Sequence, residues 1–334
     1  MGHELAALPV AVDAMGGDRA PSEIVAGARR VSEEQGIAVV LVGPPDALGE
    51  VGGLPVIPAS EVIGMDEDPA HGVRRKKDSS LVRTAEAVRD GRAMAMVSAG
   101  NTGATMGSAL LRMGRLPHVH RPAIATPVPD LDRPWPTVFL DAGANAECSA
   151  PMLVQFAQMG AAYARTRYGV ERPRVALLSI GEEESKGTPL VKETHGLLVA
   201  DRGTATGFDF VGNVEGRDFF EDKADVVVTD GFTGNVTLKT LEGSMRFLVG
   251  ALMGILGKPE VKEAADALLP HLVPLAAALD PDNVGGAMLL GVDGVCVISH
   301  GSSSAEAMVN AISVAHDLAL AGLVDELASA VAPA

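Results

Sequence analysis

The chain has 334 residues, two cysteines and a formal net charge of −16 at pH 7. This negative charge excludes a non-specific nucleic-acid-binding surface, and two cysteines are too few for a disulfide framework. No apolar run reaches the length of a bilayer span, and residues 1–8 lack a basic stretch ahead of an apolar core. We therefore expect a cytoplasmic protein without a signal peptide, and we find no Cys or His cluster with the spacing of zinc ligands.

Short apolar runs alternate with helical patterns along most of the chain, which is typical of an α/β fold with a mostly parallel sheet. Helix starts are marked by Pro at the first turn or by Thr as an N-cap, and buried strands by continuous β-branched runs. In chain order, the pattern predicts a helix from Pro21 to about Gln35, a buried strand at 37–42, a helix at 149–168, a strand at 175–180 and a helix from Thr188 to about Ala200.

Two regions interrupt this alternation. Residues 60–80 carry clustered charges without a helical or strand period, so we expect a mobile surface loop there. Two consecutive helical patterns at about 240–279 predict a helical hairpin that projects from the sheet, with Pro270 and Pro274 breaking or kinking its second helix. We treat the hairpin as an insertion within a single domain of residues 1–334.

Five apolar runs end in turns rich in Gly, Ser, Asn, Thr and Asp. In an open parallel sheet the carboxyl ends of the strands lie at one edge, which is where such folds bind ligands. Small residues let backbone N–H groups approach a ligand, and helix N-termini favour anions. One such turn can serve packing alone, but five predict an anion site assembled from distant parts of the chain. The turns are residues 13–18, 98–103, 141–145, 229–235 and 299–304.

These turns, with four further segments, resemble the phosphate acyltransferase (PlsX) family of bacterial phospholipid synthesis. Two departures stand out: Met288 lies where the family commonly has Pro, and Ile298 lies where it often has Lys. The second departure removes one cation near the turn that contains His300. The matching segments are VDAMGGD (12–18), RKKDSS (75–80), VSAGNTG (97–103), DAGAN (141–145), GEEESKG (181–187), GNVEGRD (212–218), DGFTGN (230–235), GG (285–286) and HGS (300–302).

The resemblance implies transfer of a fatty acyl group from acyl carrier protein to inorganic phosphate, which gives an acyl phosphate. It implies a three-layer α/β/α fold related to the phosphotransacetylases and the isopropylmalate dehydrogenases, a homodimer, and no metal or organic cofactor. Members of the family act in the cytoplasm and associate peripherally with the membrane, upstream of a membrane glycerol-3-phosphate acyltransferase.

Three residues are candidate catalytic groups. Lys186 is a lysine that the family is thought to use, and its ammonium can add to an anion site or remain a solvated loop charge. Asn235 can donate to phosphate or to the oxyanion, and it can also cap the helix that follows. His300 is a candidate proton donor to the departing thiolate, although a structural hydrogen bond explains it equally well.

The remaining candidates come from the polar turns and are assigned to binding phosphate or acyl substrate. Asp13 is expected to organise its turn rather than act as a base, because a carboxylate repels phosphate. Asn101 and Thr102 can contact phosphate or cap a helix. The binding candidates are Asp13, Gly16, Gly17, Ser98, Asn101, Thr102, Gly103, Asn145, Gly234, Gly301 and Ser302.

Alternatives to this mechanism and function stay open. Cys148 could accept the acyl group before phosphate does, but it has no adjacent His, and packing explains it better. A phosphotransacetylase-like enzyme using acyl-CoA and a non-catalytic membrane-associated scaffold are the other function classes. A dinucleotide dehydrogenase is disfavoured because no Gly-x-Gly-x-x-Gly follows the first strand.

Two surfaces are expected to meet partners. A local basic patch is needed to receive the acidic acyl carrier protein against the net charge of the chain. The hairpin is expected to pack in the homodimer at its base and to touch an anionic membrane surface weakly with its 252–268 tip. The patch candidates are Arg74, Arg75, Lys76, Lys77, Arg112, Arg115 and Arg121.

Overall fold

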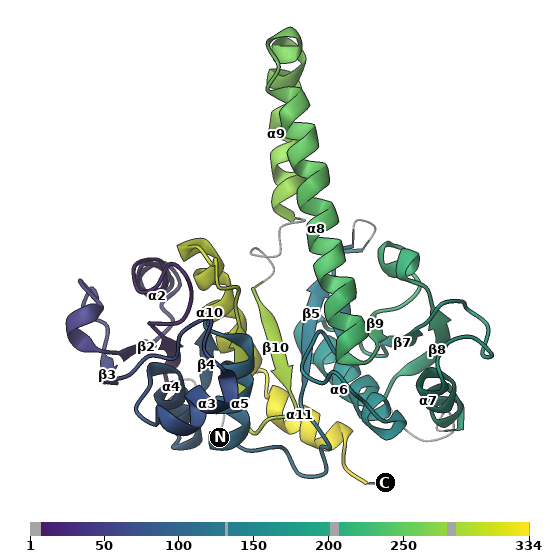
Figure 1. The fold of residues 1–334 in the computed structure, drawn as a ribbon, viewed down its shortest axis with the longest axis horizontal. Coiled ribbons are helices and arrows are strands. Elements are labelled where there is room, and N and C mark those ends of the chain that lie inside the picture. Colours follow the sequence, from purple (N-terminus) through teal and green to yellow (C-terminus); the bar gives the residue numbers. More distant parts are fainter. Residues whose placement is uncertain (1–7, 131–132, 201–206, 279–284, 334) are drawn as a thin grey trace.

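The computed structural model describes residues 8–130, 133–200, 207–278 and 285–333. In this part of the chain the strands form one 11-stranded sheet with the order β3-β2-β1-β4-β11-β10-β5-β6-β9-β7-β8 (Figure 1). The strands are β1 (Val10–Asp13), β2 (Val39–Gly43), β3 (Val56–Pro58), β4 (Ala95–Ser98), β5 (Ala123–Val128), β6 (Thr137–Leu140), β7 (Arg174–Leu178), β8 (Asp209–Val214), β9 (Val226–Val228), β10 (Ala287–Leu290) and β11 (Val295–Ile298).

The sheet contains two groups of parallel strands that run in opposite directions. One group comprises β1, β2, β3, β4 and β11, and the other comprises β6, β7, β8 and β9. Between them lie β10 and β5, and the pairings β11–β10, β10–β5 and β5–β6 are antiparallel. The carboxyl ends of β1, β4 and β11 therefore point to one edge, while those of β6 and β9 point to the other. The expectation that all five polar turns share one edge is wrong, because the apolar pattern locates strands without giving their directions. Residues from the turns after β4, β6, β9 and β11 nevertheless line one cavity.

Side-chain caps begin several of the helices. Asn101 accepts a hydrogen bond from the Ala104 amide at the start of α5 (3.0 Å), and Thr188 accepts one from Val191 at the start of α7 (3.3 Å), as expected for an N-cap. The helices are α2 (Ser22–Gln35), α3 (Pro69–Arg75), α4 (Ser80–Arg89), α5 (Thr102–Arg112), α6 (Ala150–Tyr168), α7 (Pro189–Ala200), α8 (Gly231–Leu256), α9 (Lys262–Ala278), α10 (Ala305–Leu320) and α11 (Leu323–Ala330). Short 3-10 turns are η1 (Pro45–Ala47), η3 (Gly216–Phe220) and η4 (Pro259–Val261).

Helices cover both faces of the sheet, which gives the expected three-layer arrangement (Figure 1). Because side chains alternate along a strand, neighbouring residues enter different cores. Val295 and Val297 lie in the core formed with α2, α6, α10 and α11, whereas Cys296 and Ile298 pack with α4 and α5. Both faces of the sheet are thus buried, which explains why the strands appear in the sequence as continuous apolar runs.

The predicted loop at 60–80 is not a loop throughout. It contains α3, whose Asp68 N-cap accepts a hydrogen bond from the His71 amide at 2.7 Å, with Pro69 at the first helical position. Lys76 ties the segment together by donating to the Glu67 carboxylate (2.6 Å) and to the Val62 carbonyl (2.7 Å). Asp68 followed by Pro69 is a sequence signal for the start of a helix, but the clustered charges around it favoured the prediction of a loop.

α8 and α9 form the expected hairpin, which projects from the sheet (Figure 1). Its first helix begins before residue 240, directly after β9. Its second helix continues through Pro270 and Pro274, so neither proline ends the helix: an internal proline removes one hydrogen bond, and of the two expected outcomes, a break or a kink, the break is wrong. Side chains on α8 that are both apolar and exposed are Phe232, Val236, Phe247, Leu248, Leu252, Met253 and Ile255.

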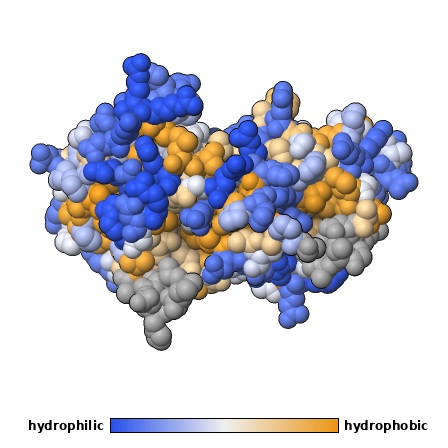
Figure 2. Space-filling view, turned by 90° about the horizontal axis from the view of Figure 1, so that it is seen from below, coloured by the Kyte–Doolittle hydropathy of each residue, from blue (hydrophilic) through white to orange (hydrophobic). Residues whose placement is uncertain are grey.

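On the face opposite the hairpin, the described residues form no continuous apolar stripe. Figure 2 shows this face, where hydrophobic areas alternate with hydrophilic ones. In the described ranges no single helix is long and apolar enough to cross a membrane. Together, α10 and α11 meet that test only as a pair bent by 62°, and most of their apolar residues belong to the main core.

Candidate functional site

A cavity of about 170 Å³ lies on the sheet face that carries α4 and α5, between the start of α5 and the side of α8. One part of its wall is apolar and the other carries hydrogen-bonding groups. The apolar lining residues are Met65, Ile124, Pro127, Val128, Pro129, Ala142, Leu238, Leu241, Met245, Ala287 and Ile298. The others are Gly100, Thr102, Thr126, Asn235, Lys239, Glu242, Gly286, Ser299, His300 and Gly301.

The turns after β1, β4 and β11 meet at one end of this cavity. Ser98 donates a hydrogen bond to the buried Asp13 carboxylate (2.8 Å) and accepts one from the Gly100 amide (3.0 Å). The Asp18 amide donates to the Gly301 carbonyl at 2.7 Å. These contacts join three segments that are far apart in sequence, as the polar turns predicted.

Glycine is required where these turns touch. A Cβ atom on Gly16 would lie 2.6 Å from Asp13 Oδ2 and 2.7 Å from the Gly100 nitrogen, so no side chain fits there.

Burial raises the pKa of Asp13, against hydrogen bonds from Ser80, Ser98 and the backbone that lower it. Asp13 thus organises its turn, as its expected role required, and it is not in the cavity wall.

Asn101 is fully used inside the protein. Its side-chain oxygen caps α5, and its amide nitrogen donates to the carbonyls of Met65 (2.8 Å) and Glu67 (3.3 Å). Gly103 lies against α3, where a Cβ would be 2.8 Å from Pro69 Cγ. The neighbouring Thr102 does line the cavity. The capping alternative for Asn101 is therefore confirmed by its contacts.

The turns after β6 and β9 form a second cluster. Asp141 accepts hydrogen bonds from the amides of Ile124, Gly143, Ala144 and Asn145 and from the Asn145 side chain, at 2.8–3.1 Å. Burial raises the pKa of this carboxyl, while these donors oppose the rise. Asn145 is therefore directed at Asp141, and its side chain also donates to the Pro122 carbonyl at 2.8 Å.

Asn235 lies in α8 and does not cap it. The N-cap is Asp230, which accepts from the Thr233 amide at 2.9 Å, so the capping alternative for Asn235 is wrong. Asn235 Nδ2 lies 3.3 Å from the Ala142 carbonyl oxygen, and the residue lines the cavity. The preceding Gly234 packs so closely that an added Cβ would lie 1.8 Å from the Asp141 carbonyl oxygen.

His300 shares the cavity wall with a buried carboxylate that the sequence reading missed. The Glu242 side chain is 5% exposed, and His300 Nε2 lies 3.8 Å from its Oε1 atom. Lys239 donates to both Glu242 oxygens (2.9 and 3.2 Å), and Arg246 Nη2 lies 3.6 Å from Oε2. The signal was available in the spacing of Lys239, Glu242 and Arg246, which places them on one side of a helix.

Lys186 lies away from this cavity wall. It is exposed in the turn after β7, where its amide donates to the Glu183 carbonyl at 2.9 Å. The structure brings together four of the fourteen predicted site residues as cavity lining: Thr102, Asn235, His300 and Gly301. The ten outside the lining are Lys186, Asp13, Gly16, Gly17, Ser98, Asn101, Gly103, Asn145, Gly234 and Ser302.

The cysteines have the surroundings of packing residues. Burial raises the pKa of the Cys148 thiol to about 11 and that of Cys296 to about 12. Cys148 Sγ lies 3.6 Å from the Asn145 carbonyl oxygen and outside the cavity wall. Within the described residues, no group of three His, Cys, Asp or Glu side chains is placed to hold a metal ion.

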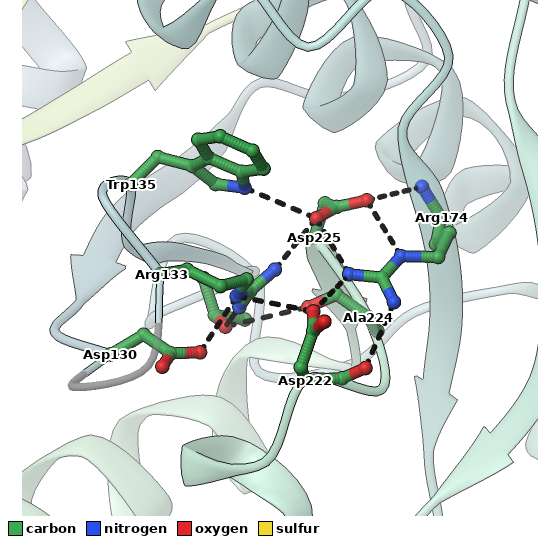
Figure 3. A network of polar contacts seen from close by, with 8 residues as sticks. Asp130, Arg133, Trp135, Arg174, Asp222, Ala224 and Asp225 are labelled. Atoms are coloured by element: carbon green, nitrogen blue, oxygen red, sulfur yellow. Dashed lines mark hydrogen bonds and ion pairs between the residues drawn. The ribbon is translucent and has the colours of Figure 1, made fainter.

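A second polar network lies away from the cavity, at the amino ends of β6, β7 and β9 (Figure 3). Asp225 is its centre and accepts from Arg133 (2.6 Å), from Trp135 (3.2 Å) and from the backbone and side chain of Arg174 (2.8 and 3.1 Å). Burial alone would raise the pKa of Asp225, but the Arg174 and Trp135 hydrogen bonds outweigh it and lower the pKa. Arg133 also binds Asp130 at 2.8 Å.

Three members of the predicted basic patch are engaged within the chain. Lys76 binds Glu67, Arg112 Nε lies 3.7 Å from Glu86 Oε1, and Arg115 donates to the carbonyls of Val119 and His120. Arg74 and Arg75 occupy the last turn of α3, next to the segment that contains Met65 of the cavity wall.

Comparison with known proteins gives one consistent family. A family model described as "Fatty acid synthesis protein" matches residues 8–325. The phosphate acyltransferase of Heliobacterium modesticaldum is 47% identical over 321 residues, 92% of each chain. That of Myxococcus xanthus is 47% identical over 327 residues, covering 95% of this chain and 91% of the relative.

Solved structures show the same fold at much lower identity. A phosphotransacetylase from Streptococcus pyogenes superposes with a TM-score of 0.64 at 17% identity, covering 95% of this chain and 96% of that one. The EutD phosphotransacetylase from Staphylococcus aureus gives 0.62 at 16% identity, with the same coverage. This likeness confirms the expected relation to the phosphotransacetylase fold.

Proposed function

Because the chain belongs to the phosphate acyltransferase family, it is an acyltransferase, and we propose that it moves a fatty acyl group from acyl carrier protein to inorganic phosphate. The observation that carries this proposal is the two-sided cavity. Val128, Leu238 and Leu241 offer an apolar wall to an acyl chain, while Thr102 and His300 offer donors to an anion. A site for acyl transfer to phosphate needs both kinds of surface.

In this proposal, phosphate attacks the thioester directly. A phosphate oxygen forms a bond to the carbonyl carbon, the carbon–sulfur bond then breaks, and the carrier leaves as a thiolate that takes up a proton. Asn235 Nδ2 carries two N–H groups, and only one is needed for Ala142, so the other can stabilise the carbonyl oxygen as charge develops. His300 is the proton donor that lies in the cavity wall.

The decisive assay measures thioester consumption with acyl carrier protein and coenzyme A donors of equal chain length. Hydroxylamine traps the acyl phosphate as a hydroxamate, so the product is identified as well as counted. We expect turnover that depends on phosphate and prefers the carrier protein. Turnover without phosphate would overturn the proposal, and a preference for coenzyme A would overturn the donor assignment.

We also propose that Arg74 and Arg75 help to receive the acidic carrier, because they lie beside the cavity-bordering segment. Charge reversal to Glu at both positions should raise KM for the carrier donor, most strongly at low salt. Reversal of Arg172 in the loop before β7, where it pairs with Asp209 at 2.7 Å, is the matched control. An unchanged KM in the α3 variant would reject this docking surface.

The exposed apolar residues of α8 support a homodimer and a weak, reversible contact with anionic membranes. Lys258 and Lys262 near the tip favour anionic headgroups, whereas Glu260 and Glu263 oppose them. Replacing Leu252 and Ile255 with Glu should release the protein from anionic vesicles in flotation while activity with soluble substrate remains. Dissociation of the dimer in that variant would instead assign these residues to the subunit interface.

A further inference from the structure

The described cavity wall contains a single Lys or Arg side chain, which is Lys239. Phosphate carries up to two negative charges at neutral pH, and an anion in a partly apolar cavity is costly without a nearby cation. Lys186, the lysine singled out by the sequence, is exposed and is not in that wall. Within the described cavity wall, a cationic contact from Lys or Arg to phosphate can therefore come only from Lys239 on α8.

Glu242 fixes the position of this lysine. The ammonium of Lys239 lies 2.9 and 3.2 Å from the two carboxylate oxygens of Glu242, one helical turn further along α8. Glu242 is 5% exposed whereas Lys239 is 54% exposed, so the carboxylate is held inside and the ammonium reaches solvent. A lysine ammonium has three N–H donors, and two contacts to Glu242 leave one donor for a ligand.

The surroundings of Glu242 explain why a buried carboxylate is tolerated beside an anion site. Lys239 and Arg246 both contact it, so two permanent positive charges face one negative charge. His300 approaches the same carboxylate from the turn after β11, at 3.8 Å. Lys239 and Arg246 together outnumber the single negative charge of Glu242, so the carboxylate is compensated and can serve as the anchor of the cluster.

We propose that Lys239 binds the phosphate substrate through its free N–H donor, and that Glu242 is a positioning residue that holds Lys239 against the cavity. This inference rests on the proposed function, because it assigns a contact to the nucleophile of that reaction. Arg246 is 81% exposed and outside the lining, so it contributes charge to Glu242 without contacting the ligand.

Steady-state kinetics test the assignment when inorganic phosphate and the acyl donor are varied in turn, each with the other substrate saturating. Lys239→Met should raise KM for phosphate about ten- to a hundredfold, the range expected for loss of a charge-assisted hydrogen bond. Lys239→Arg keeps the charge and should restore most of the affinity. Glu242→Gln should raise KM about three- to tenfold, because the ammonium stays charged but loses its anchor. Lys192→Met removes an exposed lysine on α7 and is the matched control, with no change expected.

A second readout avoids turnover altogether. Phosphate should raise the Tm of the unaltered protein, and this rise should be lost in Lys239→Met. An unaltered KM and an unaltered phosphate-induced rise in Tm in this variant would overturn the inference, while phosphate-dependent turnover by the unaltered protein would leave the proposed function standing. A rise confined to KM for the acyl donor would overturn the assignment to the nucleophile. No phosphate-dependent turnover by any form would overturn the proposed function itself.

Discussion

The molecule contains two clusters of carboxylates and basic side chains, which differ in whether their hydrogen-bond donors are already used within the protein. The Asp225 network at the amino ends of β6, β7 and β9 is closed, since Asp225 is surrounded by donors from Arg133, Trp135 and Arg174 (Figure 3). The Glu242 cluster is open, because Lys239 keeps a donor for a ligand and lies in a cavity wall. Similar chemistry thus serves the fold in one place and a substrate in the other.

What separates the two clusters is how many donors are already used. In the Asp225 network the buried groups satisfy one another, and removal of one leaves an uncompensated charge. In the Glu242 cluster, the distance of 3.8 Å between His300 Nε2 and Glu242 Oε1 is too long for a hydrogen bond, and the Lys239 side chain is half-exposed. Mutations in the first cluster should therefore lower stability, and mutations in the second should change substrate binding.

The largest effect is expected for Arg133→Met. Arg133 is 6% exposed and Asp225 is 4% exposed, so the variant leaves a buried carboxylate without one of its partners. We expect the free energy of unfolding to fall by about 3–5 kcal/mol in urea titrations. The exposed pair Arg172–Asp209 is the control, and Arg172→Met should cost less than about 1 kcal/mol. Equal losses in both variants would show that the closed network has no special role.

The next largest effect is expected for Lys186→Ala, which should lower activity. Lys186 belongs to neither cluster. The family resemblance implies a role for Lys186 in the reaction, although Lys186 lies outside the cavity wall. On that basis, we expect Lys186→Ala to lower kcat/KM by a factor that corresponds to about 2–4 kcal/mol of transition-state free energy. If Lys186 acts only in the transition state, kcat carries the loss, whereas loss of Lys239 appears in KM for phosphate. A folded Lys186→Ala protein with full activity would remove this residue from the mechanism.

The closed network should also be visible in the pH dependence of stability. The pKa of Asp225 is lowered in the folded protein relative to its ordinary value of 3.8. Its contribution is therefore fully present above about pH 4 and is lost as the pH falls through the lower, folded value. Urea titrations between about pH 2 and pH 5 should show a shallower acid loss in Asp225→Asn than in the parent protein. Identical slopes would contradict the ionised state of Asp225.

The smallest effect is expected at Cys148. Its pKa of about 11 keeps the thiol protonated at neutral pH, so it is a poor nucleophile. Mass spectrometry of the protein with acyl donor and no phosphate should show no acyl adduct, and Cys148→Ser should retain activity. A stoichiometric adduct that disappears in Cys148→Ser would replace direct transfer with a two-step route.

Much of the fold could be predicted from the sequence, because buried strands and capped helices leave local signals. The runs at Val138, Val226 and Val295 all became strands, and Thr188 caps α7 as expected. Strand direction could not be predicted, since the reversal at β10 and β5 depends on pairing between distant segments.

Part of the site could also be predicted, because some of its residues carry local sequence signals. His300 and Asn235 were found because they lie in polar turns that follow strands, and both line the cavity. Lys239 and Glu242 were missed because they lie inside a helix, where an i, i+3 charge pair usually indicates a solvated face. Only the packing of α8 beside the sheet shows that this pair faces a cavity.

The most direct test of the open cluster is a crystal structure with tungstate, a heavy tetrahedral anion that marks phosphate sites. We expect tungstate in the cavity, with an oxygen about 3 Å from Lys239 Nζ and with Glu242 still bound to the same ammonium. Tungstate bound only beside Lys186, outside the cavity, would contradict the assignment of the phosphate site to this cluster.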